Sequence, residues 1–184
     1  DLDLHLLGEG RHDRLWTVLG AHSRAHQGTE GTAFTVWAPS ARAVRVVGDW
    51  NGWDGRVHPM RNLGASGVWE IFVPEAAPGR RYKFEVLGAD GVTRLKADPY
   101  ATASETPPAT ASLIFRSGYD WGDGEWMARR AQARPWDERM SVYEVHLGSW
   151  MRHPDGRSLG YRDLAERLAD HVADLGFTHV ELLP

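Results

Sequence analysis

The sequence contains no cysteine, which excludes disulfide bonds and thiolate chemistry. It has no segment with the pattern of a signal peptide and no apolar run close to the roughly 20 residues that a membrane helix needs. Its 21 basic and 25 acidic residues give a net charge of −4 without a basic stripe, so nucleic acid is not expected as a partner. The sequence therefore favours a cytoplasmic protein that binds neither nucleic acid nor membrane.

Tryptophan, in contrast, is abundant, with nine residues in a chain of 184. An indole ring gives a core a large buried area, and its flat face also stacks on the apolar face of a sugar ring. Hydrophobic residues make up 42% of the chain, which is enough for a real core. The composition is compatible with a folded protein that binds carbohydrate.

Residues 1–30 are polar and hold four histidines without a metal-binding pattern. These are His5, His12, His22 and His26. Their separations of 7, 10 and 4 residues do not match the spacing of Cys/His zinc sites. We interpret the segment as a linker or as the tail of a preceding N-terminal module, and we expect no metal and no cofactor.

Residues 31–117 have the pattern of an all-β domain. Short runs rich in β-branched and aromatic residues are separated by proline and glycine, as in β-sandwiches. The runs cover 33–37, 43–47, 68–73, 81–86 and 111–115, and Asp90-Gly91 is a hairpin turn signal. Trp37 and Trp69 lie inside two of these runs, so we expect both to be core or interface residues.

Residues 118–139 read as a linker, and residues 140–184 follow the order strand, helix, strand. Apolar side chains between Tyr161 and Leu175 recur on one helix face, and Gly176 follows at the position of a left-handed C-terminal cap. Such a unit forms a right-handed parallel crossover, and a parallel sheet needs more than two strands. We therefore expect the start of a larger fold that is cut off at the end of the chain.

The stretch Asp49-Trp50-Asn51-Gly52-Trp53-Asp54, followed by Pro59-Met60, resembles the glycogen-binding modules of carbohydrate-binding family 48. The runs 34–39, 82–84 and 96–100 lie where that family has a first strand, a later core strand and the exit from a hairpin. The resemblance implies an immunoglobulin-like β-sandwich that binds α-glucan. It also implies that Trp53 and Lys83 contact the glucan, with Trp50 and Asn51 beside them.

The chain departs from the family 48 pattern at two places. Val92-Thr93-Arg94-Leu95 stands where a second platform tryptophan is expected, and Ala111-Ser112 stands in place of a late asparagine. Losing one of two stacking faces should weaken glucan binding by roughly 1–3 kcal/mol.

The segments 143–150, 160–165 and 175–184 resemble the first strand, first helix and second strand of the catalytic barrel in glycogen branching enzymes of glycoside hydrolase family 13. Residues 3–10 and 19–22 are similar to sequence that joins an extra N-terminal module in these enzymes. The implied fold is mainly β: an immunoglobulin-like β-sandwich followed by the first β-α-β unit of an incomplete (β/α)8 barrel.

The resemblance implies a transferase that cleaves α-1,4-glucan and joins the segment to a 6-hydroxyl group, which forms the α-1,6 branches of glycogen. Retaining enzymes of this type need two carboxyl groups about 5 Å apart, and barrel enzymes hold them at the C-terminal ends of strands. No acidic residue here matches a catalytic position of the family. We therefore expect no catalytic residue in this fragment and no activity from it alone.

Tyr143 and His146, on the expected first barrel strand, are candidates for support of the active site. The resemblance makes Tyr143 the better candidate, although a core tyrosine with a satisfied hydroxyl group explains the residue equally well.

Other functions remain open for the whole chain. They are a stand-alone glycogen-binding module, a β-sandwich that only packs against other domains, and a fragment of a debranching or trehalose-forming relative. The continuation Leu147-Gly148-Ser149-Trp150 favours branching over debranching.

Overall fold

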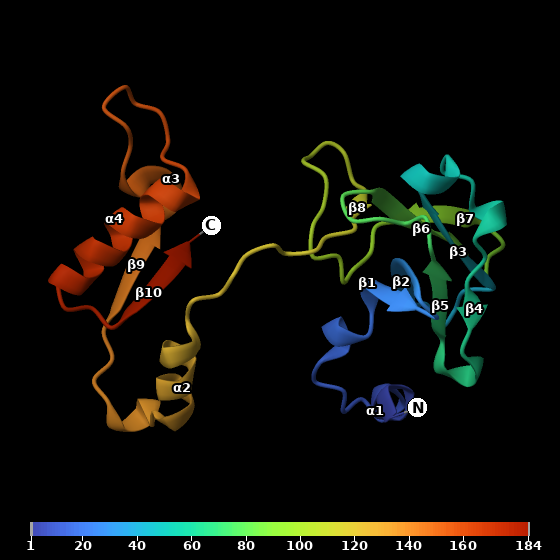
Figure 1. The fold of residues 1–184 in the computed structure, drawn as a ribbon, viewed down its shortest axis with the longest axis horizontal. Coiled ribbons are helices and arrows are strands. Elements are labelled where there is room, and N and C mark those ends of the chain that lie inside the picture. The colour runs from blue at the N-terminus through green and yellow to red at the C-terminus, as the bar shows by residue number, and fades with distance from the viewer. Residues whose placement is uncertain (1, 184) are drawn as a thin grey trace. The chain divides into compact units, whose positions relative to one another are not determined.

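The computed structural model describes residues 2–183, which divide into two compact units (Figure 1). The first unit extends to Tyr119, and the second begins at Asp120. None of the helices within residues 2–183 combines the length and the apolar content needed to cross a bilayer.

The first unit contains two antiparallel sheets. One has the strand order β1-β2-β5-β4, and the other has the order β3-β6-β7, with β8 paired to β6. The first sheet consists of β1 (Gly20–His26), β2 (Thr29–Trp37), β4 (Arg61–Asn62) and β5 (Val68–Val73). The second consists of β3 (Ala43–Gly48), β6 (Arg81–Leu87), β7 (Thr93–Lys96) and β8 (Ser112–Leu113). The β-sandwich predicted from the sequence is confirmed.

Alternation along the strands builds the core of this unit. Phe34 and Val36 are buried on β2, and Tyr82 and Phe84 are buried on β6. The rings of Phe34 and Tyr82 meet edge to face with their centroids 5.1 Å apart, which joins the two sheets. Full burial of one large apolar side chain stabilises a fold by about 1.5–3 kcal/mol. These rings therefore supply much of the stability of the sandwich.

Residues 20–26, which the sequence analysis assigned to a linker or tail, form strand β1. This strand pairs with β2 from Gly20 opposite Thr35 to His26 opposite Thr29. It is an edge strand, and its inner face carries only small side chains, so the usual apolar alternation is missing from its sequence. Before it come helix α1 (Leu2–Gly8) and the 3-10 turn η1 (Leu15–Thr17), and three further 3-10 turns follow: η2 (Asp49–Asn51), η3 (Gly55–Val57) and η4 (Gly64–Ser66).

Trp37, predicted as a core or interface residue, does not lie in the core, and an interface role for it stays a prediction. It lies on the opposite face of β2 from Phe34 and Val36 and is 53% exposed, with its indole N–H donating to the Ser66 carbonyl at 3.2 Å. Trp69, in contrast, is buried as expected and donates to the Ala38 carbonyl at 3.1 Å.

A buried carboxylate connects β6 to the loop after β7. Asp98 accepts hydrogen bonds from the Tyr82 hydroxyl group at 2.6 Å and from the Tyr100 N–H at 2.8 Å, and its own N–H donates to Ser112 Oγ at 2.9 Å. Burial raises the pKa of Asp98, although the hydrogen bond from Tyr82 acts in the opposite direction. The ionised Asp98 carboxylate therefore lowers the free energy of unfolding at neutral pH. Below the ordinary pKa of Asp the group is protonated in both the folded and the unfolded state, and this effect disappears.

The second unit begins with a short helical stretch and continues as strand, helix, strand. Helix α2 (Gly124–Gln132) and the 3-10 turn η5 (Pro135–Asp137) lie in the stretch that the sequence analysis assigned to a linker. Strands β9 (Val142–His146) and β10 (His179–Leu183) pair in parallel, and α3 (Leu147–Trp150) and α4 (Tyr161–Asp174) lie between them in the chain.

A small apolar cluster holds α4 on the two-stranded sheet. Val145 of β9 packs with Leu168 and Val172 of α4. Gly176 follows the helix with φ +78°, the left-handed conformation predicted for its C-terminal cap. Every residue of β10 is exposed, so the two strands alone do not bury both faces of a parallel sheet.

Tyr82→Phe should lower the free energy of unfolding by about 1–3 kcal/mol at pH 7, because the buried Asp98 carboxylate loses a hydrogen-bond donor. The decrease in the free energy of unfolding caused by Tyr82→Phe should be smaller below about pH 4, because Asp98 is then protonated in both the folded and the unfolded state. Urea unfolding at the two pH values measures the difference. In an Asp98→Asn background the loss should not depend on pH, whereas a pH-independent loss with Asp98 present would contradict the assignment.

Candidate glucan-binding site

The loop of residues 48–54 is held closed by the side-chain amide of Asn51. Asn51 Oδ1 accepts a hydrogen bond from the Gly48 N–H at 2.9 Å, and Asn51 Nδ2 donates to the Val46 carbonyl at 3.1 Å. The same nitrogen lies 3.0 Å from His58 Nδ1. These partners use much of the hydrogen-bonding capacity of the amide. Asn51 therefore shapes the loop, and a direct bond from it to a sugar stays a prediction.

The two tryptophans of this loop have different surroundings. Trp50 packs on the sandwich core, and its ring stacks on Phe34 with a centroid distance of 5.4 Å. Trp53 is 37% exposed and has φ +64°, a left-handed backbone that bulky residues rarely adopt. Strain of this kind costs about 1–3 kcal/mol and is concentrated at functional sites. Trp53 is therefore the tryptophan of this loop that offers a free ring face, and Trp50 supports it from the core.

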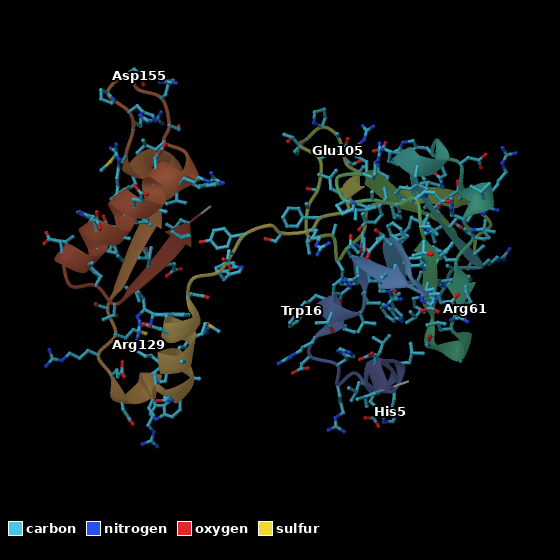
Figure 2. The ribbon with its side chains drawn as sticks, viewed as in Figure 1. His5, Trp16, Arg61, Glu105, Arg129 and Asp155 are labelled. Carbon is cyan, nitrogen blue, oxygen red and sulfur yellow. The ribbon has the colours of Figure 1, made fainter. Side chains whose placement is uncertain are left out.

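A charged network connects Trp53 to strand β6. Asp49 accepts a hydrogen bond from Trp53. It also accepts bonds from Arg81 Nη2 at 2.9 Å and from the Arg81 N–H at 2.9 Å. Arg81 Nη1 also donates a hydrogen bond to Glu105 Oε1 at 3.3 Å. Figure 2 labels Glu105. These bonds fix the base of the Trp53 loop against the sheet.

Lys83 lies on the same face of β6 as Arg81, two residues further along the strand. Its ammonium group donates to Thr110 Oγ1 at 2.6 Å. Lys83 therefore shares a strand face with Arg81, which bonds Asp49 in the Trp53 loop. That Trp53 and Lys83 contact the same sugar, by stacking and by a hydrogen bond to a hydroxyl group, stays a prediction.

The charges of this network are stable at neutral pH. The hydrogen bond from the Arg81 side chain lowers the pKa of Asp49, and Arg81 itself has a raised pKa because of Asp49 and Glu105. The pKa of Glu105 is lowered, first by the hydrogen bond from the Ala111 N–H and then by Arg81. Asp49, Arg81 and Glu105 therefore carry fixed charges at neutral pH.

The two departures from the family pattern have visible consequences. Val92 and Leu95 are exposed aliphatic residues where a second tryptophan is expected. Ala111 and Ser112 are buried, and the Ser112 hydroxyl group is occupied by the Asp98 N–H. These positions offer neither a second aromatic face nor a free amide.

The sequence motif includes Asp49 but gave it no role, and it gave no sign that Arg81, Glu105 and Thr110 belong to this region. Alternation along β6 could have found Arg81, because it shares a face with Lys83. Glu105 and Thr110 lie in the loop before β8, and nothing in the local sequence shows that this loop approaches β6.

Tyr143 faces helix α4 and not the open side of the two-stranded sheet. Its hydroxyl group accepts a hydrogen bond from Trp150 Nε1 at 3.0 Å, and its ring meets Phe177 at a centroid distance of 5.2 Å. His146 has the opposite strand parity, is exposed, and has Nδ1 2.8 Å from Ser149 Oγ. The packing favours the core explanation for Tyr143, while support of an active site by either residue stays a prediction.

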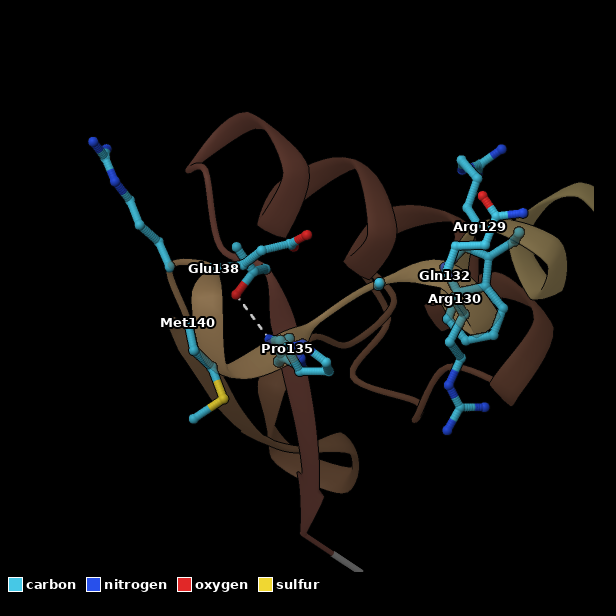
Figure 3. A pocket seen from close by; sticks show the side chains of 11 residues that line it. Arg129, Arg130, Gln132, Pro135, Glu138 and Met140 are labelled. Carbon is cyan, nitrogen blue, oxygen red and sulfur yellow. Dashed lines mark hydrogen bonds between the residues drawn. The ribbon is translucent and has the colours of Figure 1, made fainter.

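An open hollow of about 650 Å³ lies beside helix α2 in the second unit (Figure 3). Its arginines do not converge on a common point, because Arg129 and Arg130 extend in different directions in Figure 3. Arg130 lies over the Trp126 ring at 5.4 Å, and Arg129 lies 4.0 Å from Glu125. Within residues 2–183, no group of three His, Asp or Glu side chains could hold a metal ion. The hollow is therefore not a candidate anion or metal site.

The chain is similar to several known proteins. Residues 18–101 match carbohydrate-binding module 48, described as the isoamylase N-terminal domain. The whole chain is 57% identical to the 1,4-alpha-glucan branching enzyme GlgB 1 of Streptomyces coelicolor and covers 23% of that enzyme. It is 58% identical to the 1,4-alpha-glucan branching enzyme GlgB of Leifsonia xyli subsp. xyli and covers 24% of it.

Over its full length the chain is thus similar to 1,4-alpha-glucan branching enzymes, and its first unit is similar to carbohydrate-binding module 48. It spans only about a quarter of the length of the branching enzymes that it matches.

Solved structures show the same fold in larger proteins. A Salmonella typhimurium protein provisionally assigned as an alpha-amylase aligns with a TM-score of 0.64 at 26% identity, over 91% of this chain and 24% of that one. Ligand-free PulA from Klebsiella pneumoniae aligns with a TM-score of 0.64 at 24% identity, over 90% of this chain and 17% of that one. The second likeness bears on the fold alone. As with the branching enzymes, the match is to a small part of each larger chain.

Arg81→Gln should raise the pKa of Asp49 toward the ordinary Asp value, because the bond from Arg81 is the main cause of its depression. A depressed carboxyl pKa stabilises the folded state above the ordinary Asp pKa, and this contribution disappears as the pH falls through the folded value. Because the Arg81 side chain is 50% exposed and solvent screens the pair, we expect only a small loss of stability at pH 7. NMR titration of the Asp49 carboxyl group measures the pKa.

The matched control is Arg56→Gln, since Arg56 pairs with Asp54 and should leave the pKa of Asp49 unchanged. An unchanged Asp49 pKa in the Arg81 variant would contradict the network described above.

Proposed function

We propose that this chain is the N-terminal part of a glycogen branching enzyme, which transfers α-1,4-glucan segments to 6-hydroxyl groups and forms α-1,6 branches. The observation that carries the proposal is the identity of 57–58% with branching enzymes over the full chain. The match extends through both units, so it is not limited to a carbohydrate-binding module. In this proposal the catalytic carboxyl groups are supplied by sequence beyond these residues, in a cytoplasmic protein.

The first unit, in this proposal, binds the α-glucan. The exposed face of Trp53 stacks on the apolar face of one glucose residue, and Lys83 donates a hydrogen bond to a hydroxyl group of the sugar. The Asp49–Arg81 pair and the Asn51 amide hold the loop in place before the glucan arrives, so little side-chain freedom is lost on binding.

Weak binding at a single ring suits a glucan polymer. Each glycogen particle presents many equivalent chains, so several weak contacts act together and raise the overall affinity. A module of this kind increases the time that the enzyme spends near its substrate without trapping the product.

Debranching relatives and a stand-alone binding module are less well supported. The identity of 57% over the whole of this chain favours branching enzymes. The likeness to PulA of Klebsiella pneumoniae, at 24% identity, carries no functional argument. The β9-α4-β10 segment has no role in a protein that only binds glycogen.

The chain alone should form no branches, because a retaining transferase needs two carboxyl groups about 5 Å apart and no acidic residue of this chain matches a catalytic position. Amylose is incubated with the purified chain and, separately, with a longer protein that contains it. Iodine staining and chain-length analysis after enzymatic debranching then measure the branches. Branch formation by the chain alone, or none by the longer protein, would contradict the proposal.

Trp53→Ala should weaken glycogen binding about tenfold or more, since an anchoring aromatic side chain is worth at least about 1.4 kcal/mol. Retardation in native gels that contain glycogen measures the affinity. The control is Trp16→Ala, which removes a ring that is 60% exposed and lies in η1, outside the site. Unchanged mobility of the Trp53 variant would remove Trp53 from the binding site, whereas an equal loss in both variants would show non-specific binding.

A further inference from the structure

The orientation of the Asn51 side chain is fixed by its two backbone partners. The Gly48 N–H can only donate, so the amide oxygen of Asn51 lies toward it at 2.9 Å. The Val46 carbonyl can only accept, so the amide nitrogen lies toward it at 3.1 Å. That nitrogen is a donor with two hydrogen atoms, and His58 Nδ1 lies 3.0 Å from it. His58 Nδ1 is therefore the acceptor of this hydrogen bond.

An accepting Nδ1 determines the protonation state of the His58 ring. In a neutral imidazole one nitrogen donates and the other accepts, so the proton of His58 is on Nε2. A protonated ring carries hydrogen atoms on both nitrogens and would place an N–H group against the Asn51 amide nitrogen, which cannot accept. The observed loop conformation and a protonated His58 therefore exclude each other.

His58 is anchored to the elements around the loop. It follows the 3-10 turn η3, and its N–H donates to the Gly55 carbonyl at 3.1 Å. Its carbonyl accepts from the Val46 N–H of β3 at 3.1 Å, and its ring meets the Trp50 ring edge to face at a centroid distance of 6.4 Å. The ring is thus part of the packing of the loop, and a change in its charge acts directly on Asn51.

The charged groups around His58 are already paired with one another. The charged side chains of the loop, of η3 and of the adjoining strands form four pairs: Asp49–Arg81, Asp54–Arg56, Arg45–Glu85 and Arg61–Glu70. Each carboxylate in these pairs has an arginine partner, so a positive charge on His58 would have to compete for it. The surroundings therefore do not compensate a protonated His58 in the closed loop.

The closed loop also carries two local costs that favour its release. Trp53 has a left-handed backbone, with φ +64°. The indole N–H of Trp50 is buried and has no hydrogen-bond partner within residues 2–183. The Trp53 N–H donates to the Gly48 carbonyl at 3.1 Å, and the Gly48 N–H donates to Asn51. Loss of the Asn51 contacts therefore reaches Trp53 through a single residue.

We propose that His58 is a positioning residue for the loop of residues 48–54, in which its neutral ring fixes Asn51 and protonation of the ring releases Trp53. Acidification then weakens glucan binding at this loop. The choice of glucan as the ligand rests on the proposed function, whereas the release of the loop is a property of this chain that can be measured without a ligand.

The first test is an NMR titration of the isotope-labelled full chain without ligand. At about pH 8, long-range proton–nitrogen correlations should show the proton of His58 on Nε2 and a bare Nδ1. Between about pH 8 and about pH 5, the Asn51 side-chain amide and the Trp53 indole should shift together with the His58 ring. A proton on Nδ1 at the higher pH, or a His58 titration that leaves Asn51 and Trp53 unchanged, would overturn the proposal.

His58→Asn separates positioning from a purely structural role. The Asn side chain keeps a hydrogen-bond acceptor close to the position of Nδ1 but does not titrate. In native gels that contain glycogen, the unaltered chain should lose at least about threefold in affinity between about pH 8 and about pH 5, whereas His58→Asn should show no such loss. His58→Ala, which removes the acceptor, should bind weakly at both pH values.

The matched control is His5→Asn, because His5 lies in α1 and its side chain is 64% exposed. This variant should keep the pH dependence of the unaltered chain. A pH dependence in His58→Asn equal to that of the unaltered chain would overturn the proposal. An absence of glycogen binding by the unaltered chain at every pH would contradict the proposed function, and the ligand-free titration would then still support or overturn the release of the loop.

Discussion

The side-chain amide of Asn51 is the group on which the candidate site depends. It accepts from Gly48 at the end of β3 and donates back to Val46 of the same strand, so one planar group fixes the turn against the end of β3. Closure presses Trp50 onto the core at Phe34 and leaves Trp53 on a left-handed backbone with an exposed face. An amide can do this because it combines a donor and an acceptor, which neither a carboxylate nor an ammonium group does.

The rest of the first unit fixes this loop relative to β6. The Phe34–Tyr82 contact joins the two sheets, and the Asp49–Arg81 pair connects the loop to the strand that carries Lys83. The candidate binding residues, which come from distant parts of the sequence, therefore lie on one sandwich. Rigidity matters here, because one stacking contact gives only a small favourable binding free energy, which a large loss of conformational entropy would cancel.

The sandwich and the α4 segment could be predicted because their patterns repeat over short distances, and the Trp53 motif could be singled out because it resembles a family 48 signature. Alternation also shows that Trp37 must face outward once Phe34 and Val36 are placed inward, although the β-rich run alone suggested a core residue. Strand β1 could not be predicted, since its inner face has only small side chains and its pairing with β2 supplies the order. The approach of the loop before β8 to Lys83 is a tertiary contact without a local signal.

The most direct test of the central claim, that α-glucan binds the sandwich through the ring of Trp53, follows the indole N–H resonances of the chain during a titration with maltoheptaose. The account predicts a large, saturable shift for the Trp53 indole and almost none for the Trp50 indole, whose ring is packed on Phe34. A Trp53 resonance that does not move at saturating maltoheptaose would contradict the account. The packing of the loop around Trp53 would then have a structural role and no role in glucan binding.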